Sequence, residues 1–408
     1  MKKTQRLLEK LSHTNQVILN TGRQVRILET INWQDDLCRQ AIARFRKQDY
    51  FIPKQDYSKQ DFGTVKETLL AVSQIKEGEH PLVQYLARMA DAYVVAIKML
   101  EGIGEESFTQ NSMQLYGNPR DILPGFRLSY LDVAKKMLSY CKDFEQDFGR
   151  KQEESWQPLR VKEFFEAEAQ RSFPGESIDV QLDDKMSALA AVSQSRIKIN
   201  SSGQYTRVLA RQLWFHEAEV HLLTSLNGQS QRLVSALSLS HPASTIDQEG
   251  LASFSELMTE TIDFYRLERL ALRVVAIDMA LQGADFVEVY QFFCERGQSV
   301  ESSFYATARV FRGGNPRGVV AFTKDIVYVA GLLRVFNHFR SAILKKDLNL
   351  IDMVFCGKIN LDDIPLLREA LAEGMIDKPK YLPSWASSKE CLAASLIFMS
   401  FIDKLQER

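Results

Sequence analysis

The residues with the clearest chemical potential form a six-residue segment from His216 to His221, which reads HEAEVH. Imidazole nitrogens and carboxylate oxygens are common ligands of zinc. In the familiar zinc-peptidase motif, the two histidines stand four residues apart and share one face of a helix. Here they stand five apart, which separates their side chains by about 140° on a regular α-helix. We therefore expect either an empty motif or a helix that ends or carries a π-bulge at this point.

The alternative to a metal site is a buried helix that carries two ordinary histidines. A helix is expected after Ser201-Ser202-Gly203, and its apolar stripe contains Tyr205, Val208, Leu209 and Leu213. His216 continues this stripe, and a polar ring that faces a core needs a partner. Since a metal ion would be such a partner, the position of His216 favours the metal site.

A third ligand is available on a second predicted helix. Thr245 is the expected N-cap of this helix, and Gln248 would complete a capping box. One helical face would then carry the side chains of Glu249, Ser253, Glu256 and Glu260. Such a stripe is usually a solvated acidic face. Beside HEAEVH, it favours Glu249 as a metal ligand, with Ser253 and Glu256 as acceptors for the histidine N–H groups.

Glu217 directly follows His216 and is the candidate for acid–base chemistry. As a general base, it would take a proton from the attacking water and later deliver it to the leaving amine. We find no convincing fourth protein ligand in the sequence. A zinc site with an open position is typical of catalysis, whereas a structural zinc is usually closed by four protein ligands.

Composition limits the class of protein and its partners. The 51 Lys and Arg residues balance the 52 Asp and Glu residues, so the sequence lacks the basic excess of many nucleic-acid binders. The five cysteines are scattered and form no CxxC pair, which argues against a cysteine-based zinc site and a disulfide framework. No apolar stretch is long enough to span a bilayer. We expect a cytoplasmic protein with no nucleic-acid partner and no membrane partner.

Hydrophobic periodicity predicts an α+β fold that is mainly helical. Residues 1–150 are expected to form a helical N-terminal region, packed on a catalytic domain of residues 151–408. Gly102 to Gly125 is expected to form loops between helices. Strand patterns occur at three places, namely Ile178–Leu182, Met186–Val192 and Arg196–Asn200. A small sheet would therefore precede the helix that carries HEAEVH.

These residues also resemble a known family, the bacterial "QEGLA motif" proteins, which include the microtubule-associated tyrosine carboxypeptidases of animals. The likeness rests on HEAEVH, Thr224, Asn227-Gly228, QEGLA at 248–252, RVFRG at 309–313, FTKD at 322–325, Tyr328, Gly331 and Leu382-Pro383. The resemblance implies a zincin-like metallopeptidase with one zinc ion per chain, held by His216, His221 and Glu249. It also implies Glu217 as the catalytic base. In the animal members the terminal tyrosine of a protein is removed, so the implied substrate is a peptide or protein C-terminus.

A carboxypeptidase needs a cation that holds the terminal carboxylate, and the arginine fork suits this role. The candidates are Arg309 and Arg312 in RVFRG and Lys324 in FTKD. Tyr328, one helical turn after Lys324, is a candidate for the same pocket and for a hydrogen bond to the oxyanion. Each of these residues has an alternative role at the surface or in a structural salt bridge.

The sequence therefore predicts a zinc carboxypeptidase that removes a C-terminal residue, with an aromatic residue as one option. The alternative is a non-catalytic regulatory or binding protein that keeps the metallopeptidase fold. Glu217 separates the two predictions, since a structural metal site needs no carboxylate at that position. A DNA-binding regulator is a third hypothesis, but the chain has neither a basic balance nor a recognition motif.

Overall fold

The computed structural model describes residues 2–58, 60–75, 78–123, 126–148, 154–186 and 188–406. The chain is mainly helical and contains two small sheets, so the predicted α+β class is confirmed, whereas the zincin-like architecture stays a prediction. Within these residues, no helix combines the length and the apolar character that a bilayer crossing requires.

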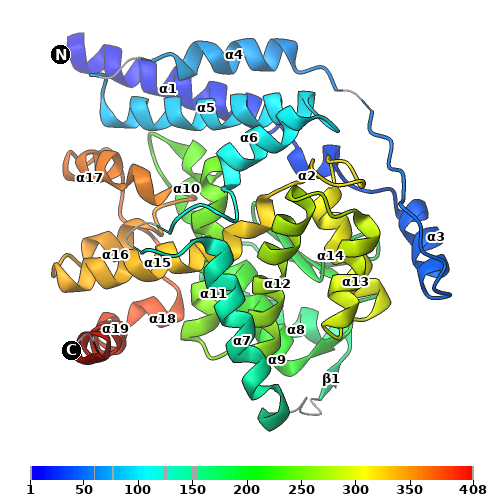
Figure 1. Cartoon of the computed structure of the whole chain (residues 1–408). Helices are drawn as coiled ribbons and strands as arrows, with labels where there is room; N and C mark the ends of the chain where they lie inside the picture. The colour runs from blue at the N-terminus through cyan, green and yellow to red at the C-terminus, as the bar shows by residue number, and fades with distance from the viewer. Residues whose placement is uncertain are drawn as a thin grey trace.

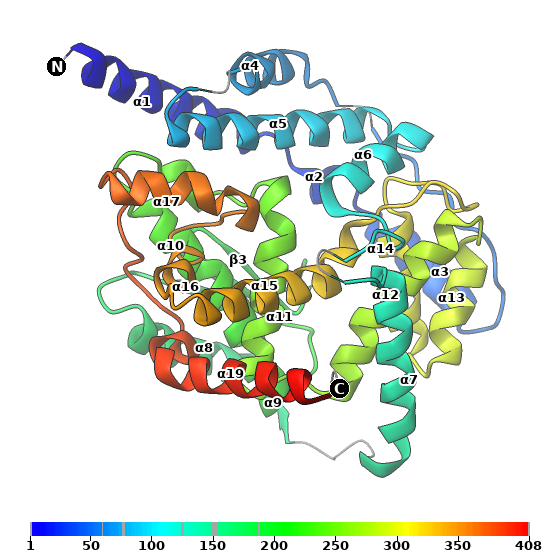
Figure 2. The same ribbon diagram turned by 60° about the vertical axis from the view of Figure 1, so that its left-hand side comes forward.

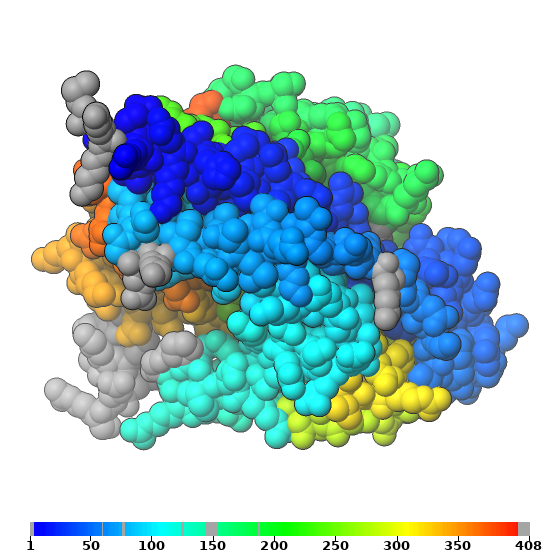
Figure 3. All heavy atoms as spheres, turned by 90° about the horizontal axis from the view of Figure 1, so that it is seen from above, coloured from blue at the N-terminus to red at the C-terminus, as the bar shows by residue number. Residues whose placement is uncertain are grey.

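The N-terminal helices form a layer across one side of the molecule (Figure 1). This layer contains α1 (Lys2–Gly22), α4 (Gly63–Ser73) and α5 (Pro81–Glu101), and α5 is buried on most of its surface. Seen from above in Figure 3, the N-terminal part of the chain, in blue and cyan, covers most of this face. Beneath α5 lie α6 (Glu106–Tyr116) and α17 (Ile364–Ala372).

The predicted loop from Gly102 to Gly125 is wrong in its centre, because α6 forms there. The glycines only flank this helix. Gly102 ends α5, and Gly117 ends α6 with a φ of 93°, a left-handed conformation that favours glycine. Pro124 and Gly125 lie outside the described residues.

Two helices of the first 150 residues leave this layer and pack on later parts of the chain. Helix α3 (Asp35–Phe45) follows α2 (Ile27–Thr30) and contacts α14 (Val300–Phe311). The ring of Phe45 lies 4.7 Å from that of Tyr290 in α13 (Phe286–Glu295), an edge-to-face contact that fixes α3 in place. Helix α7 (Tyr130–Phe148) packs on α12 (Phe264–Leu281). The proposed division of the chain near residue 150 stays a prediction.

The three predicted strands form one sheet with the order β2-β4-β3, which confirms the prediction of a small sheet. The strands are β2 (Asp179–Asp183), β3 (Ala190–Ser193) and β4 (Arg196–Asn200). Strand β2 runs parallel to β4, and β3 runs antiparallel to it. The side chains of Ile197 and Ile199 are fully buried, and α8 (Pro158–Ser172) packs on β2 and β4. Strand β3 is therefore an edge strand, and it contacts the helix that carries HEAEVH.

That helix has three consecutive parts, α9 (Arg207–Leu213), the π-helix η1 (Trp214–Leu222) and α10 (Leu223–Gln229). It begins after a short pair of strands, β1 (Ser155–Trp156) and β5 (Tyr205–Thr206). Helix α11 (Thr245–Met258) packs against η1, and α15 (Val327–Leu344) packs against α11.

Helices α11 and α15 touch at two glycines. A Cβ atom on Gly250 would lie 2.2 Å from the carbonyl carbon of Gly331, and a Cβ on Gly331 would lie 2.0 Å from Ile246 O. Side chains at these positions would hold the two backbones apart. The glycines therefore bring the start of α15 close to the part of α11 that carries Glu249.

The remaining helices and 3₁₀ turns lie in the second half of the chain. Figure 2 shows α19 (Lys389–Gln406) in the lower part of the molecule, and this helix packs on α15. The others are two short helices, α16 (Asn349–Met353) and α18 (Ser384–Ser387), and the 3₁₀ turns η2 (Ser235–Ser238), η3 (Pro242–Ser244), η4 (Lys324–Ile326) and η5 (Leu361–Asp363).

Candidate metal centre

The HEAEVH segment lies entirely within the π-helix η1, which confirms the predicted departure from a regular helix. A π-helix bonds residue i to residue i+5, so side chains five residues apart come to the same side. The rings of His216 and His221 have centroids 5.0 Å apart and face the same region. The π-helix therefore brings together two histidines that a regular α-helix would hold apart.

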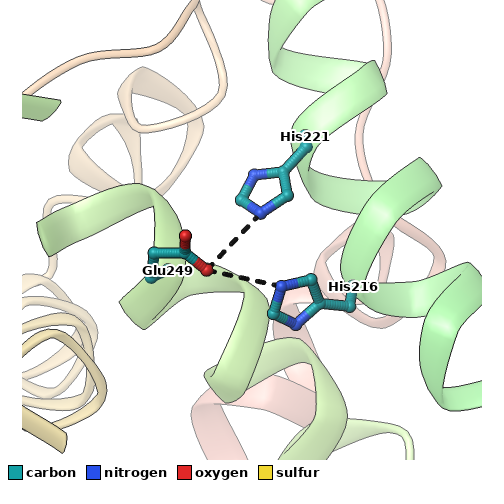
Figure 4. A group of neighbouring side chains, drawn as sticks. All are labelled: His216, His221 and Glu249. Carbon is teal, nitrogen blue, oxygen red and sulfur yellow. Dashed lines mark ion pairs between the residues drawn. The ribbon is translucent and has the colours of Figure 1, made fainter. Parts of the chain in front are cut away.

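Glu249 on α11 joins the two histidines. Its Oε2 lies 3.5 Å from Nε2 of His216 and 3.9 Å from Nε2 of His221 (Figure 4). One ligand atom from each of the three residues lies within 4.8 Å of the other two. Three donors bound to one tetrahedral ion at bond lengths near 2.1 Å lie roughly 3.4 Å apart. The predicted ligand set therefore converges closely enough to hold one ion, and two His with one Glu is a donor set of catalytic zinc sites.

Glu256, two turns after Glu249, fixes the orientation of His216. The Nδ1–H of His216 donates to Oε1 of Glu256 at 2.7 Å, which turns Nε2 toward Glu249. Glu256 is fully buried and also accepts two hydrogen bonds from Arg266, at 3.0 and 2.9 Å, and one from Gln212 at 3.0 Å. The predicted acceptor role of Glu256 is thus confirmed. The other expected acceptor, Ser253, has a buried Oγ without a hydrogen-bond partner in the described part of the chain.

Two details of the predicted second helix are wrong. The N-cap of α11 is Ser244, which makes no side-chain capping bond, so Thr245 and Gln248 form no capping box. Instead, Oε1 of Gln248 accepts a hydrogen bond from the hydroxyl of Thr224 in α10 at 2.9 Å. Glu260 lies beyond the end of α11 and is exposed, because the helix stops at Met258 and the chain turns away.

The candidate ligands and their neighbours form a cluster of opposite charges. Burial alone would lower the pKa of His216, but the carboxylates of Glu249 and Glu256 raise it to about 10. Burial likewise opposes the ionisation of Glu249, yet the charge of Lys324 and the two histidines hold the pKa of Glu249 well below its ordinary value. A metal ion would therefore take the place of a proton on His216, since a ligating imidazole must be neutral.

A cleft of about 550 Å³ opens beside this cluster, and both His216 and Glu217 line it. The N-terminal segment contributes Trp33 and Asp35 to the lining, as do residues 188–190, the last of which begins β3. Five arginines also line the cleft, namely Arg266, Arg269 and Arg273 of α12 and Arg309 and Arg312 at the end of α14. The sequence analysis missed the three arginines of α12. Their spacing of three and four residues, which places them on one helical face, was the available signal.

Most charges near the cleft are already paired. Arg309 donates to both carboxylate oxygens of Asp325 at 2.6 Å, and Arg273 lies 3.7 Å from the same carboxylate. The ammonium of Lys324 donates to Oε1 of Glu249 at 3.0 Å. Two of the residues predicted to bind substrate, Arg309 and Lys324, thus bind acidic residues of this chain.

Arg312 differs from these cations. Its Nε is buried and has no hydrogen-bond partner among the described residues, and its guanidinium lies 5.1 Å from the ring centroid of Phe322. Burial and the neighbouring charge of Arg309 lower the pKa of Arg312 to about 10. The fourth predicted residue, Tyr328, lines the same cleft, and its ring lies 5.5 Å from the ammonium of Lys324.

The second acid of the HEAEVH segment, Glu219, has a structural role. Its Oε2 accepts hydrogen bonds from the backbone N–H and the hydroxyl of Ser384, at 2.9 and 2.8 Å. Its Oε1 lies 3.4 Å from Nε1 of Trp214. Glu219 therefore ties the C-terminal segment after Leu382-Pro383 to the π-helix.

Comparison with known proteins agrees with this geometry. A family model described as "Microtubule-associated tyrosine carboxypeptidase" matches residues 43–404. This match includes η1, α11 and the end of α14, the parts that carry the candidate site. The class is therefore that of the carboxypeptidases. The chain belongs to the microtubule-associated tyrosine carboxypeptidase family, which confirms the resemblance seen in the sequence. A search of curated proteins gives no match to the chain.

Proposed function

We propose that this protein is a zinc-dependent carboxypeptidase that removes the C-terminal residue of a peptide or protein. The observation that supports this most strongly is the convergence of His216, His221 and Glu249 beside a cleft that Glu217 also lines. Among the residues that the structure describes, only these three form such a cluster, which is the arrangement of catalytic rather than structural zinc. The proposed location is the cytoplasm.

Each residue has a distinct role in this proposal. A bound zinc ion would polarise the scissile carbonyl and make water more acidic. Glu217 takes the proton of the attacking water and passes it to the leaving amine. Tyr328 donates a hydrogen bond to the oxyanion that develops on the scissile carbonyl. The edge strand β3 pairs with the backbone of the substrate, because it has a free edge and contacts η1.

Arg312 receives the terminal carboxylate in this proposal. A buried donor without a partner costs about 1–3 kcal/mol, and a carboxylate would satisfy it through a two-point contact. Arg309 supports this site from its bond with Asp325. Lys324 does not bind the terminal carboxylate in this proposal, because its ammonium is hydrogen-bonded to Glu249.

The test uses the purified full chain and peptides with free or amidated C-termini. We expect about one zinc per chain, cleavage of the free acids and a strong loss of cleavage on amidation. Glu217→Gln should keep the metal and lose hydrolysis. Arg312→Met should raise the KM for free acids and reduce the discrimination against amides. Turnover by Glu217→Gln at the wild-type rate would show that the general base lies elsewhere. Equal cleavage of amides would indicate an endopeptidase.

A further inference from the structure

Glu249 uses its two carboxylate oxygens in different ways. Oε1 accepts a hydrogen bond from the ammonium of Lys324 at 3.0 Å. Oε2 is the oxygen that faces His216 and His221, at 3.5 and 3.9 Å from their Nε2 atoms (Figure 4). The ion pair with Lys324 therefore leaves a single oxygen of Glu249 directed at the place where an ion would lie.

Lys324 is held firmly in this position. The residue before it, Thr323, is tied to Ser112 of α6 through both its backbone and its side chain. Its N–H donates to the hydroxyl of Ser112 at 2.9 Å, and the two hydroxyls lie 3.0 Å apart. The next residue, Asp325, is bound by Arg309. Lys324 is only 9% exposed. If its ammonium moved away from Glu249, a buried charge would be left without a partner, which is costly.

We propose that Lys324 is a positioning residue that keeps Glu249 a one-oxygen ligand of the metal. This inference rests on the metal site proposed above. A carboxylate that turned both oxygens to the ion would add a ligand and occupy space that water and a substrate carbonyl need in a catalytic site. The hydrogen bond from Lys324 occupies Oε1 and opposes this turn, in the way that outer groups orient metal ligands.

The role differs from the substrate-binding role that the sequence suggests for Lys324, and the two are separable by experiment. Lys324→Met removes both the charge and the hydrogen bond, whereas Lys324→Gln keeps a donor. Lys345→Met, at the exposed end of α15, is the control for loss of a lysine elsewhere. Each protein is loaded with Co²⁺, whose visible absorption is strong in four-coordinate sites and weak when more ligands bind. The values of kcat and KM are then measured for a free-acid peptide with the zinc forms.

We expect Lys324→Met to weaken the Co²⁺ absorption and to lower kcat about 10–100-fold. KM should change by less than about threefold, because the lysine does not touch substrate. Lys324→Gln should recover part of the Co²⁺ absorption and part of kcat, and Lys345→Met should match the wild type in both. A Co²⁺ spectrum of Lys324→Met identical to that of the wild type would overturn the inference. A raised KM with unchanged kcat would also overturn it, because that result would show that Lys324 binds substrate. If the wild type bound no divalent ion, the metal site itself would be wrong, a failure distinct from these two.

Discussion

Glu256→Gln is the sharpest test of the arrangement around the metal site. In the wild type, four hydrogen bonds reach the Glu256 carboxylate, one each from His216 and Gln212 and two from Arg266. A glutamine at this position has one acceptor oxygen, and its NH₂ group would face donors. The substitution also removes the hydrogen-bonded counter-charge of the buried Arg266. Breaking a buried pair in this way costs about 3–5 kcal/mol of stability.

The effect on metal binding follows from the same contacts. Without the acceptor at Nδ1, the ring of His216 loses the bond that turns Nε2 toward Glu249. Loss of such an outer partner typically weakens metal binding 10–100-fold, or about 1.4–2.7 kcal/mol. Loss of the Glu256 charge also lowers the pKa of His216 and so the proton competition for the site. Zinc affinity is therefore measured by competition with a chelator at several pH values, and stability by denaturant unfolding of the metal-free protein. Both are measured at a temperature where every variant is folded.

Glu260→Gln is the matched control, because Glu260 is exposed and lies beyond the end of α11. It should change stability by less than about 0.5 kcal/mol and leave zinc affinity unaltered. If Glu256→Gln bound zinc as tightly as Glu260→Gln at every pH, the bond from His216 to Glu256 would not orient the candidate ligand, and the reasoning would be refuted.

Two further predictions concern the helix pair and the protonation of the site. Gly250→Ala should destabilise the protein by about 1–3 kcal/mol in thermal or denaturant unfolding, because its Cβ would lie 2.2 Å from the backbone of Gly331. Gly63→Ala, whose Cβ meets only the Asp61 side chain at 3.2 Å, should be neutral, and equal effects of the two would contradict the close approach. Zinc affinity should rise about tenfold per pH unit up to a pH of about 10, because the raised pKa of His216 keeps a proton on the ring that zinc must displace. Calorimetry in buffers of different ionisation enthalpy should show about one proton released near neutral pH, and no release would exclude this linkage.

The sequence by itself determined the candidate ligand set and the need for an unusual helix. His216 and His221 stand five residues apart, a spacing that a regular helix cannot bring to one ion, so the irregularity of η1 could be predicted from geometry alone. The alternation of Ile197 and Ile199 likewise predicted a strand, because a period of two residues is a local property.

Tertiary structure alone decided which charged side chains are free to bind a ligand. RVFRG and FTKD identify cations near the site, but only the packed chain pairs Arg309 with Asp325 and Lys324 with Glu249. The same holds for Glu256, whose partner Arg266 lies on another helix. These pairings join elements far apart in the sequence, or depend on how closely two helices approach. Local periodicity carries no information about such distances, whereas close packing in the folded core fixes them.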